Sequence, residues 1–315
     1  MKIYMAPLEG ITGHIYRNTY EENFGECIDK YFAPFIVPSD NKRLAGKEIR
    51  DVIPENNYIE NMHLVPQILT NNGTHFLKAA AQLKTMGYNE INFNAGCPSG
   101  TVVNKNRGAG FLKDPIHMKR FFDEVFEETE KLGVKVSVKT RIGFESPLEF
   151  EDIMKVYNQF PFEEIIVHPR TGRQMYKGVP DMEQFGYACD NAKVSLCYNG
   201  DIKTVDNYND IIDKYNIDSV MLGRGIIRNP MLPEQIIYGC DIDYDKIRKF
   251  HNEYYRRYCE VISGDVHVLF KMREVWIYMS EIFENPHKCL KMVRKAQSLK
   301  AYDEAVERIF SSARI

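Results

Sequence analysis

The sequence lacks any hydrophobic run long enough to cross a membrane. No apolar stretch approaches the roughly 18 residues that a membrane-spanning helix needs. The first residues begin a strand-like run at once, where a signal peptide would show a charged region followed by an apolar one. We therefore expect a soluble, cytoplasmic protein that is not anchored to a membrane.

Cysteine pairs with metal-binding spacing are also missing. The seven cysteines are an odd number, are scattered along the chain, and include no Cys-x-x-Cys pair. This pattern argues against a zinc site and against a disulfide framework, so we expect no metal. Most of these cysteines are expected to be small buried residues or surface thiols. Only Cys97 lies in a context that suggests chemistry.

An overall excess of positive charge is absent as well. The formal net charge is -3 and the isoelectric point is about 6.3, whereas domains that bind nucleic acids are often basic. Only the segment after about residue 241 has a slight excess of lysine and arginine. Any nucleic-acid binding must therefore depend on a local patch. No segment indicates an obligate protein partner.

What the sequence does contain is an alternation of short apolar runs and longer amphipathic ones. Eight strands interleaved with helices predict a parallel α/β fold. The count of eight favours a (β/α)8 barrel, the TIM barrel, over an open doubly wound sheet, and no Gly-x-Gly-x-x-Gly follows the first strand. The predicted strands are residues 3–6, 31–36, 64–69, 90–94, 135–140, 164–168, 194–198 and 219–222, and helical patterns include 74–86, 116–132, 148–159 and 204–215.

The strand patterns stop near residue 241. Residues 244–262, 268–283 and 286–298 have helical patterns instead. We therefore predict two domains, a barrel over residues 1–240 and a small all-helical domain over residues 241–315.

Polar, cationic and glycine residues gather where the predicted strands end. In a barrel of this class the active site lies at the carboxyl ends of the strands, so these residues are expected to meet at one rim. They are Pro7, Leu8, Glu9, Gln67, Asn94, Cys97, Lys139, Arg141, His168, Arg170, Asn199, Gly200, Asp201, Gly223 and Arg224.

Two of these groups predict an anionic ligand. Lys139 lies in a strand that should be apolar, and a buried cation is costly unless it has an anionic partner. Residues 199–201 and 223–224 follow the seventh and eighth strands, where barrels commonly bind phosphate through backbone N–H groups. Glycine allows a close approach of the backbone, and Arg224 can form a bidentate contact. A single phosphate group fits FMN better than FAD.

The order of these motifs resembles the tRNA-dihydrouridine synthase family. The motifs are residues 5–12, 94–98, 108–112, 139–141, 168–171, 199–201 and 223–224. The Asn-x-Gly-Cys-Pro element at residues 94–98 is the most specific of them, while the Ala-Pro opening and the Gly-Arg pair also occur in other flavin barrels.

This resemblance implies an FMN-dependent enzyme that uses NADPH to reduce the C5=C6 bond of uridine in RNA. It implies that hydride passes from flavin N5 to uracil C6 and that Cys97 gives a proton to C5. A thiol with an ordinary pKa of about 8.5 is mostly protonated at neutral pH and can serve as an acid.

The resemblance also assigns the remaining residues. It implies that Asn94, Arg141 and Arg170 contact the substrate, although Arg141 could equally form an ion pair at the surface. The implied cofactor contacts are Pro7, Leu8, Glu9, Gln67, Lys139, His168, Asn199, Gly200, Asp201, Gly223 and Arg224.

The carboxyl-terminal segment carries a series of basic residues, of which Lys291, Arg294 and Lys295 share one helical face. The resemblance implies that this segment and the barrel rim together hold the RNA by its phosphates and shape. The residues leave open whether the target is tRNA or ribosomal RNA, and which uridine is modified. They also leave open a flavin-barrel reductase of free pyrimidines and a non-catalytic RNA-binding relative.

Overall fold

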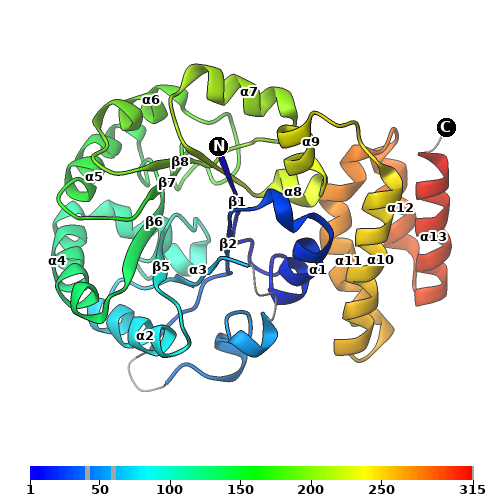
Figure 1. The fold of residues 1–315 in the computed structure, drawn as a ribbon, viewed down its shortest axis with the longest axis horizontal. Coiled ribbons are helices and arrows are strands. Elements are labelled where there is room, and N and C mark those ends of the chain that lie inside the picture. The colour runs from blue at the N-terminus through cyan, green and yellow to red at the C-terminus, as the bar shows by residue number, and fades with distance from the viewer. Residues whose placement is uncertain (40–42, 58–61, 314–315) are drawn as a thin grey trace.

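The computed structural model describes residues 1–39, 43–57 and 62–313. Its centre is a ring of parallel strands surrounded by helices (Figure 1). The strands are β1 (Lys2–Met5), β2 (Lys30–Phe32), β3 (Leu64–Val65), β4 (Gln67–Ile68), β5 (Glu90–Ala95), β6 (Lys135–Arg141), β7 (Ile165–His168), β8 (Leu196–Tyr198) and β9 (Ser219–Leu222). The predicted TIM barrel is confirmed, and all eight predicted strands are present with ends that differ by at most a few residues.

The ring closes at one strand that is divided into two parts. The hydrogen-bonded order is β3-β2-β1-β9-β8-β7-β6-β5-β4, so its two ends are neighbours in the sequence. Pro66 separates β3 from β4 and has no N–H to donate to a neighbouring strand. Its carbonyl still accepts a hydrogen bond from the Asn92 N–H at 2.9 Å. The described residues therefore form nine strand segments, where the sequence predicted eight strands.

Helices follow the strands and cover the outside of the ring (Figure 1). Their ends follow local sequence rules, as in α4, where the Asp114 side chain accepts from two backbone N–H groups and Gly133 ends the helix in the left-handed conformation. The barrel helices are α1 (His14–Phe24), α2 (Gly73–Thr85), α3 (Gly100–Val103), α4 (Pro115–Leu132), α5 (Phe150–Tyr157), α6 (Met182–Asn191), α7 (Val205–Lys214), α8 (Arg224–Arg228) and α9 (Leu232–Tyr238).

Side chains of each strand alternate between the helices and the interior of the ring. In β5, Phe93 packs outward on aromatic residues of α4, while Asn92 and Asn94 are buried on the inner side. A separate apolar cluster fills the interior, formed by Tyr4, Ala6, Phe32, Val65, Ile166, Cys197 and Met221. The polar residues of β5 therefore lie inside a packed ring.

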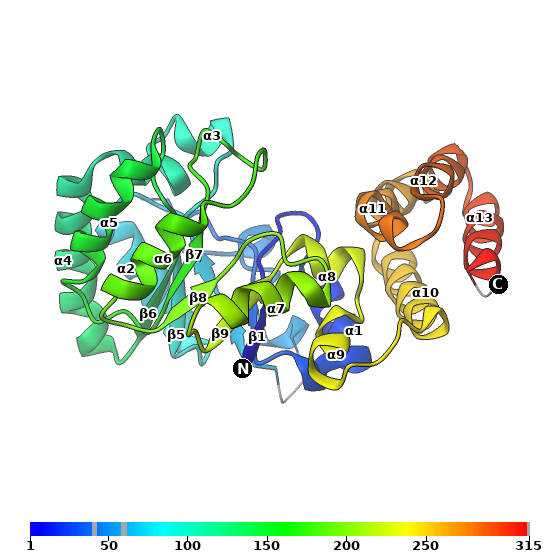
Figure 2. The same ribbon diagram turned by 90° about the horizontal axis from the view of Figure 1, so that it is seen from above.

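The carboxyl-terminal helices form a separate group beside the barrel (Figure 2). They are α10 (Tyr244–Val261), α11 (Asp265–Met279), α12 (Pro286–Lys295) and α13 (Leu299–Ser312). At their centre the indole N–H of Trp276 donates to the Tyr302 hydroxyl at 2.8 Å. The proposed domain boundary at residue 240 falls between α9 and α10. Among the described helices none is long and apolar enough to cross a membrane.

Aromatic packing joins this helical group to the barrel. Tyr16 of α1 meets Phe250 and Tyr254 of α10 in edge-to-face contacts with ring centroids 5.5 and 5.3 Å apart, and Phe24 lies 5.6 Å from Phe250. All of these rings are buried. Because aromatic side chains bury large areas and gain from such geometry, this contact holds α10 in place.

Replacing Phe250 by alanine tests this packing. Phe250→Ala should lower the free energy of unfolding by about 3–5 kcal/mol, the cost of truncating a buried aromatic ring. Chemical denaturation measures the change. The matched control is Phe270→Ala on α11, whose ring is 59% exposed and should cost little. Equal effects of the two substitutions would contradict the role given to Phe250.

Candidate active site

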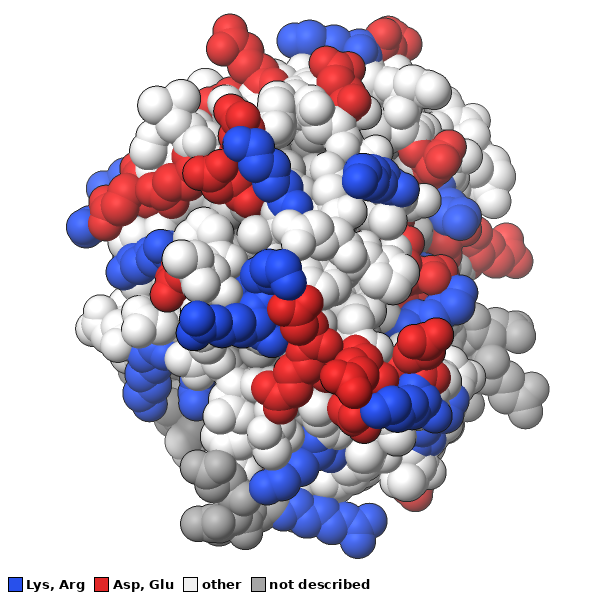
Figure 3. Space-filling model, turned by 90° about the vertical axis from the view of Figure 1, so that its left-hand side faces the viewer, with Lys and Arg blue, Asp and Glu red and all other residues white. Residues whose placement is uncertain are grey.

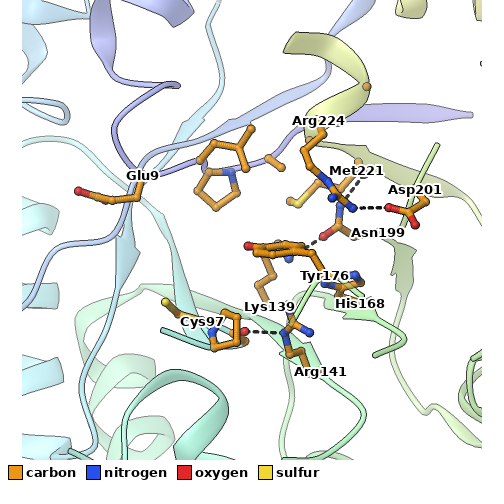
Figure 4. A pocket seen from close by; sticks show the side chains of 18 of the residues that line it. Glu9, Cys97, Lys139, Arg141, His168, Tyr176, Asn199, Asp201, Met221 and Arg224 are labelled. Carbon is orange, nitrogen blue, oxygen red and sulfur yellow. Dashed lines mark hydrogen bonds and ion pairs between the residues drawn. The ribbon is translucent and has the colours of Figure 1, made fainter. Parts of the chain in front are cut away.

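A cavity lies at the carboxyl ends of the strands (Figure 4), with about 940 Å³ of empty space that includes the open solvent at its mouth. Strand register brings its walls together, since Asn94 is level with Lys139, and Arg141 is level with His168. Of the fifteen residues predicted for the site, these line the cavity: Pro7, Leu8, Glu9, Asn94, Cys97, Lys139, Arg141, His168, Asn199, Gly200, Asp201, Gly223 and Arg224.

The other two predicted residues, Gln67 and Arg170, do not line the cavity. Gln67 is fully buried beneath Asn94 and accepts a hydrogen bond from the Asn94 amide at 2.7 Å. Arg170 is also fully buried and donates to the backbone carbonyl of Gly178 at 2.7 Å and to the side chain of Asp201. The structure thus places both behind residues of the wall, where the prediction had them touching cofactor and substrate.

Hydrogen bonds of its backbone groups hold the Cys97 loop in place. The N–H groups of Gly96 and Cys97 donate to Asn94 Oδ1 at 3.0 and 2.9 Å, and the Cys97 carbonyl accepts from Ala109 at 2.9 Å. Gly108 has φ +56°, and a β-carbon there would lie 2.5 Å from the Cys97 oxygen, so only glycine fits. Burial raises the pKa of the Cys97 thiol. The thiol is therefore protonated at neutral pH.

Lys139 lies at the base of the cavity. Its Nζ donates to Asn199 Oδ1 at 2.6 Å, and the Asn199 amide donates to the Met221 carbonyl at 2.7 Å, which turns its oxygen toward the lysine. Burial, followed by the charge of Arg141, lowers the pKa of Lys139 to about 7. An anion bound in the cavity would reverse this shift, because an opposite charge favours the protonated amine.

His168 is neutral and has a defined tautomer. Burial and then the charges of Arg141 and Lys139 hold the pKa of His168 well below its usual value. Its Nε2 lies 3.1 Å from a guanidinium nitrogen of Arg170. Because a guanidinium only donates, Nε2 is the acceptor and the proton is on Nδ1.

Asp201 binds arginines. Its carboxylate bridges Arg170 and Arg224. Burial alone would raise the pKa of Asp201, but the hydrogen bond and charge of Arg170 outweigh burial and lower it. An ionised carboxylate repels a phosphate, so any contact of residue 201 with a phosphate would come from its backbone N–H, as the sequence analysis expected for residues 199–201. The carboxylate instead fixes Arg224 at the cavity wall.

Glu9 lies apart from the other wall residues (Figure 4). Its side chain is exposed to solvent on one side, and partial desolvation followed by the charge of Asp51 raises its pKa. Pro7 and Leu8, the two residues before it, are half-buried. Glu9 is therefore at the edge of the site nearest the helical group.

Sequence reasoning missed Tyr176. Its ring lies across the cavity (Figure 4), with the guanidinium carbons of Arg224 and Arg141 at 4.9 and 5.4 Å from its centroid. Tyr176 comes from the loop between β7 and α6, eight residues after His168, beyond the strand end that the sequence analysis considered. The flanking Gly172 packs against Phe144, where a β-carbon would lie 2.4 Å from Cδ2.

The described part of the chain contains no cluster of three or more histidine, cysteine, aspartate or glutamate side chains that could hold a metal ion. All seven cysteines are free thiols. The chemistry that the cavity offers is therefore a protonated thiol, a neutral imidazole and several cations.

Comparison with protein families gives one match that spans nearly the whole chain. The family model described as dihydrouridine synthase matches residues 4–312. A probable tRNA-dihydrouridine synthase of Staphylococcus aureus is 29% identical over 238 residues, which cover 73% of this chain and 70% of that protein. A tRNA-dihydrouridine(16) synthase of Aquipseudomonas alcaligenes is 29% identical over 248 residues, 75% of each chain.

Solved structures share the fold. A morphinone reductase superimposes with a TM-score of 0.54 at 12% identity, covering 78% of this chain and 89% of its own. An old yellow enzyme from Trypanosoma cruzi gives a TM-score of 0.54 at 10% identity, covering 77% and 89%. At these identities the likeness concerns the barrel alone.

The depressed pKa of Lys139 predicts a pH-dependent stability. The lysine of the unfolded chain keeps its ordinary pKa, so between pH 7 and about 10.5 residue 139 binds more protons in the unfolded chain than in the folded one. Its contribution to the free energy of unfolding therefore rises with pH. Lys139→Met should therefore raise the thermal midpoint of the ligand-free protein at pH 7, and this gain should shrink toward pH 10. Thermal unfolding across this range measures it, with Lys119→Met at an exposed lysine of α4 as control. A gain that does not change with pH would contradict the assigned cause.

Proposed function

This chain belongs to the dihydrouridine synthase family, and from this premise we propose that it reduces the C5=C6 bond of uridine in tRNA, with FMN as cofactor and NADPH as reductant. The observation that carries the proposal is a protonated thiol, Cys97, on the wall of a cavity lined with cations. As a tRNA-modifying enzyme it is proposed to act in the cytoplasm.

The cavity fits a cofactor that carries a phosphate and an electron-accepting ring. Its walls bear the charges of Lys139, Arg141 and Arg224, and Asp201 is the carboxylate paired with Arg224. We assign the phosphate to the loops at residues 199–201 and 223–224, with Arg224 as its side-chain contact. Lys139 and the Nδ1–H of His168 would face the ring, where positive charge and hydrogen-bond donors stabilise the reduced form.

The chain's own part in the reaction is to supply a proton and hold the base. When bound, the flavin supplies the hydride that is added to C6 of uracil. Negative charge then develops toward C5 and O4, and the Cys97 thiol gives its proton to C5. Asn94 and Arg141, beside Cys97 in the cavity, are proposed to hold the base. Because burial raises the pKa of Cys97, the thiol carries its proton before the transfer.

Replacing Cys97 separates the two halves of the reaction. Cys97→Ala should leave FMN content and NADPH-driven flavin reduction nearly unchanged. Oxidation of the reduced enzyme by unmodified tRNA should slow by about 10²–10⁴-fold, the usual contribution of a general acid. Cys97→Ser should also be slow, since an alcohol is a much weaker acid than a thiol.

The measurement is stopped-flow absorbance of the anaerobically reduced protein mixed with tRNA, with nucleoside mass spectrometry of the product. Cys189→Ala, at a half-buried thiol away from the cavity, serves as the matched control. If Cys97→Ala reacts with tRNA as fast as wild type, Cys97 is not the proton donor. A purified protein that is colourless and takes up no FMN would overturn the cofactor assignment.

The surface that we propose for tRNA includes the basic residues of α12. Lys288, Lys291, Arg294 and Lys295 are exposed there, and α11 and α12 lie nearer than α10 to the side of the molecule that carries α3 and the cavity rim (Figure 2). On the flank of the barrel that is farthest from the helical group, acidic and basic side chains are interspersed (Figure 3). Phosphate contacts of this kind hold RNA without reading its sequence.

Charge reversal on α12 tests this surface. Lys291→Glu, Arg294→Glu and Lys295→Glu combined should weaken tRNA binding at least tenfold and reduce the slope of log Kd against log salt by about one for each lost phosphate contact. Turnover at saturating tRNA should change little. The control combines Lys119→Glu, Lys131→Glu and Lys155→Glu on the barrel's outer helices, where each lysine pairs with an acid. Equal losses in both triple variants would indicate a non-specific charge effect.

A further inference from the structure

A continuous series of side-chain hydrogen bonds runs through the barrel interior below Cys97. Asn94, which holds the Cys97 loop, donates its amide hydrogen to Gln67 Oε1 at 2.7 Å. Gln67 in turn donates to Asn92 Oδ1 at 2.7 Å. Asn92 and Gln67 are both fully buried. The loop that carries the thiol is therefore supported by two layers of buried amides.

The series continues to the opposite end of the barrel. Asn92 donates to Ser137 Oγ at 3.0 Å, and Ser137 donates to Glu90 Oε1 at 3.1 Å. The other oxygen of Glu90 accepts from Lys30 at 2.7 Å. Asn92 is the middle member, and it lies outside the cavity wall.

Both ends of this series fix its direction. At the upper end two backbone N–H groups can only donate, so the oxygen of Asn94 must face them and its amino group must point to Gln67. At the lower end the Glu90 carboxylate pairs with Lys30 and has no hydrogen to give, so Ser137 must donate to it. Every amide between these ends then has one orientation, in which its oxygen accepts from one neighbour and its nitrogen donates to the next.

We propose that Asn92 is a positioning residue for the reduction step, a role that rests on the proposed function of Cys97. It touches neither the cavity nor the reacting atoms. Its oxygen holds the Gln67 amide, Gln67 holds the Asn94 amide, and Asn94 fixes the two N–H groups before the thiol. Without the acceptor at residue 92, the buried amino group of Gln67 has no partner and the Asn94 side chain loses its rigid support.

The test compares Asn92→Leu with Asn92→Asp. Leucine is similar in size but offers no acceptor. A buried aspartate is kept protonated, so it accepts from Gln67 through its C=O and donates to Ser137 Oγ through its O–H, which leaves the Ser137 hydrogen on Glu90. Ser219→Ala is the matched control, because Ser219 is an equally buried hydroxyl that bonds to Glu164, outside the series. All variants are studied as FMN-loaded protein.

Two readouts are used. The first is the rate at which unmodified tRNA oxidises the anaerobically reduced enzyme. The second is the pH profile of iodoacetamide alkylation at Cys97, read from the Cys97 peptide by mass spectrometry. Asn92→Leu should slow the oxidation of the reduced enzyme by tRNA about 10–100-fold, which is the effect of a small misplacement of a reacting group. It should also lower the pH midpoint of alkylation, because a loosened loop reduces the burial of the thiol.

Asn92→Asp should react with tRNA at least tenfold faster than Asn92→Leu, and its pH midpoint of alkylation should return toward that of wild type. Ser219→Ala should change neither the rate nor the midpoint. Wild-type values for Asn92→Leu in both readouts, or an Asn92→Asp variant as impaired as Asn92→Leu, would overturn the inference. If Asn92→Leu does not fold, Ser137→Ala decides, since it removes the next link. A slower rate with a lowered midpoint supports the inference, and wild-type values overturn it. A wild-type enzyme that does not react with tRNA would instead refute the proposed function, and the alkylation profile would still test Asn92.

Discussion

Because the strands are parallel and form a closed ring, their carboxyl ends all lie at one rim. Side chains alternate along each strand, so every second one points into the ring. Asn94, Lys139 and His168 converge on the cavity for this reason alone, since each is an inward residue near the carboxyl end of its strand. The same constraint forces the inward residues below them into a closed interior, where each polar group must find a partner. The hydrogen-bonded series under Cys97 satisfies this requirement along β5.

The rim carries an excess of positive charge, although the net charge of the chain is -3. Lys139, Arg141 and Arg224 surround the cavity, and Asp201 is shared between Arg224 and the buried Arg170. The pKa values of Lys139 and His168 are lowered first by burial and then by this surplus of positive charge. A site of this kind binds an anion with little reorganisation, at the expense of stability in its absence.

The sequence predicted the barrel and most of the cavity wall because strand ends are local and the rim follows from topology. The sequence could not distinguish residues that line the cavity from residues that lie buried behind the lining. Gln67 and Arg170 are strand-end polar residues like the others, but their partners, Asn94 and Asp201, are decided by packing between different strands. Tyr176 was missed because its position depends on the path of a loop, which no periodic pattern encodes. Pro66 could have indicated the divided strand, since proline interrupts a ladder.

The helical group and the cavity share one loop, which would link the proposed docking of RNA to the chemistry. Residues 7 and 8 line the cavity, and the same loop continues to Gly10, whose carbonyl accepts from Lys271 of α11 at 3.0 Å. Thr12 closes the turn by accepting from the Leu8 N–H at 2.7 Å, and its own carbonyl accepts from the buried Arg17 at 2.6 Å. Arg17 belongs to α1, the helix that packs on α10 through Tyr16 and its neighbours. The position of the helical group and the shape of the cavity wall are thus fixed by the same residues, so a macromolecule bound across α11 and α12 would meet a cavity whose geometry is already set.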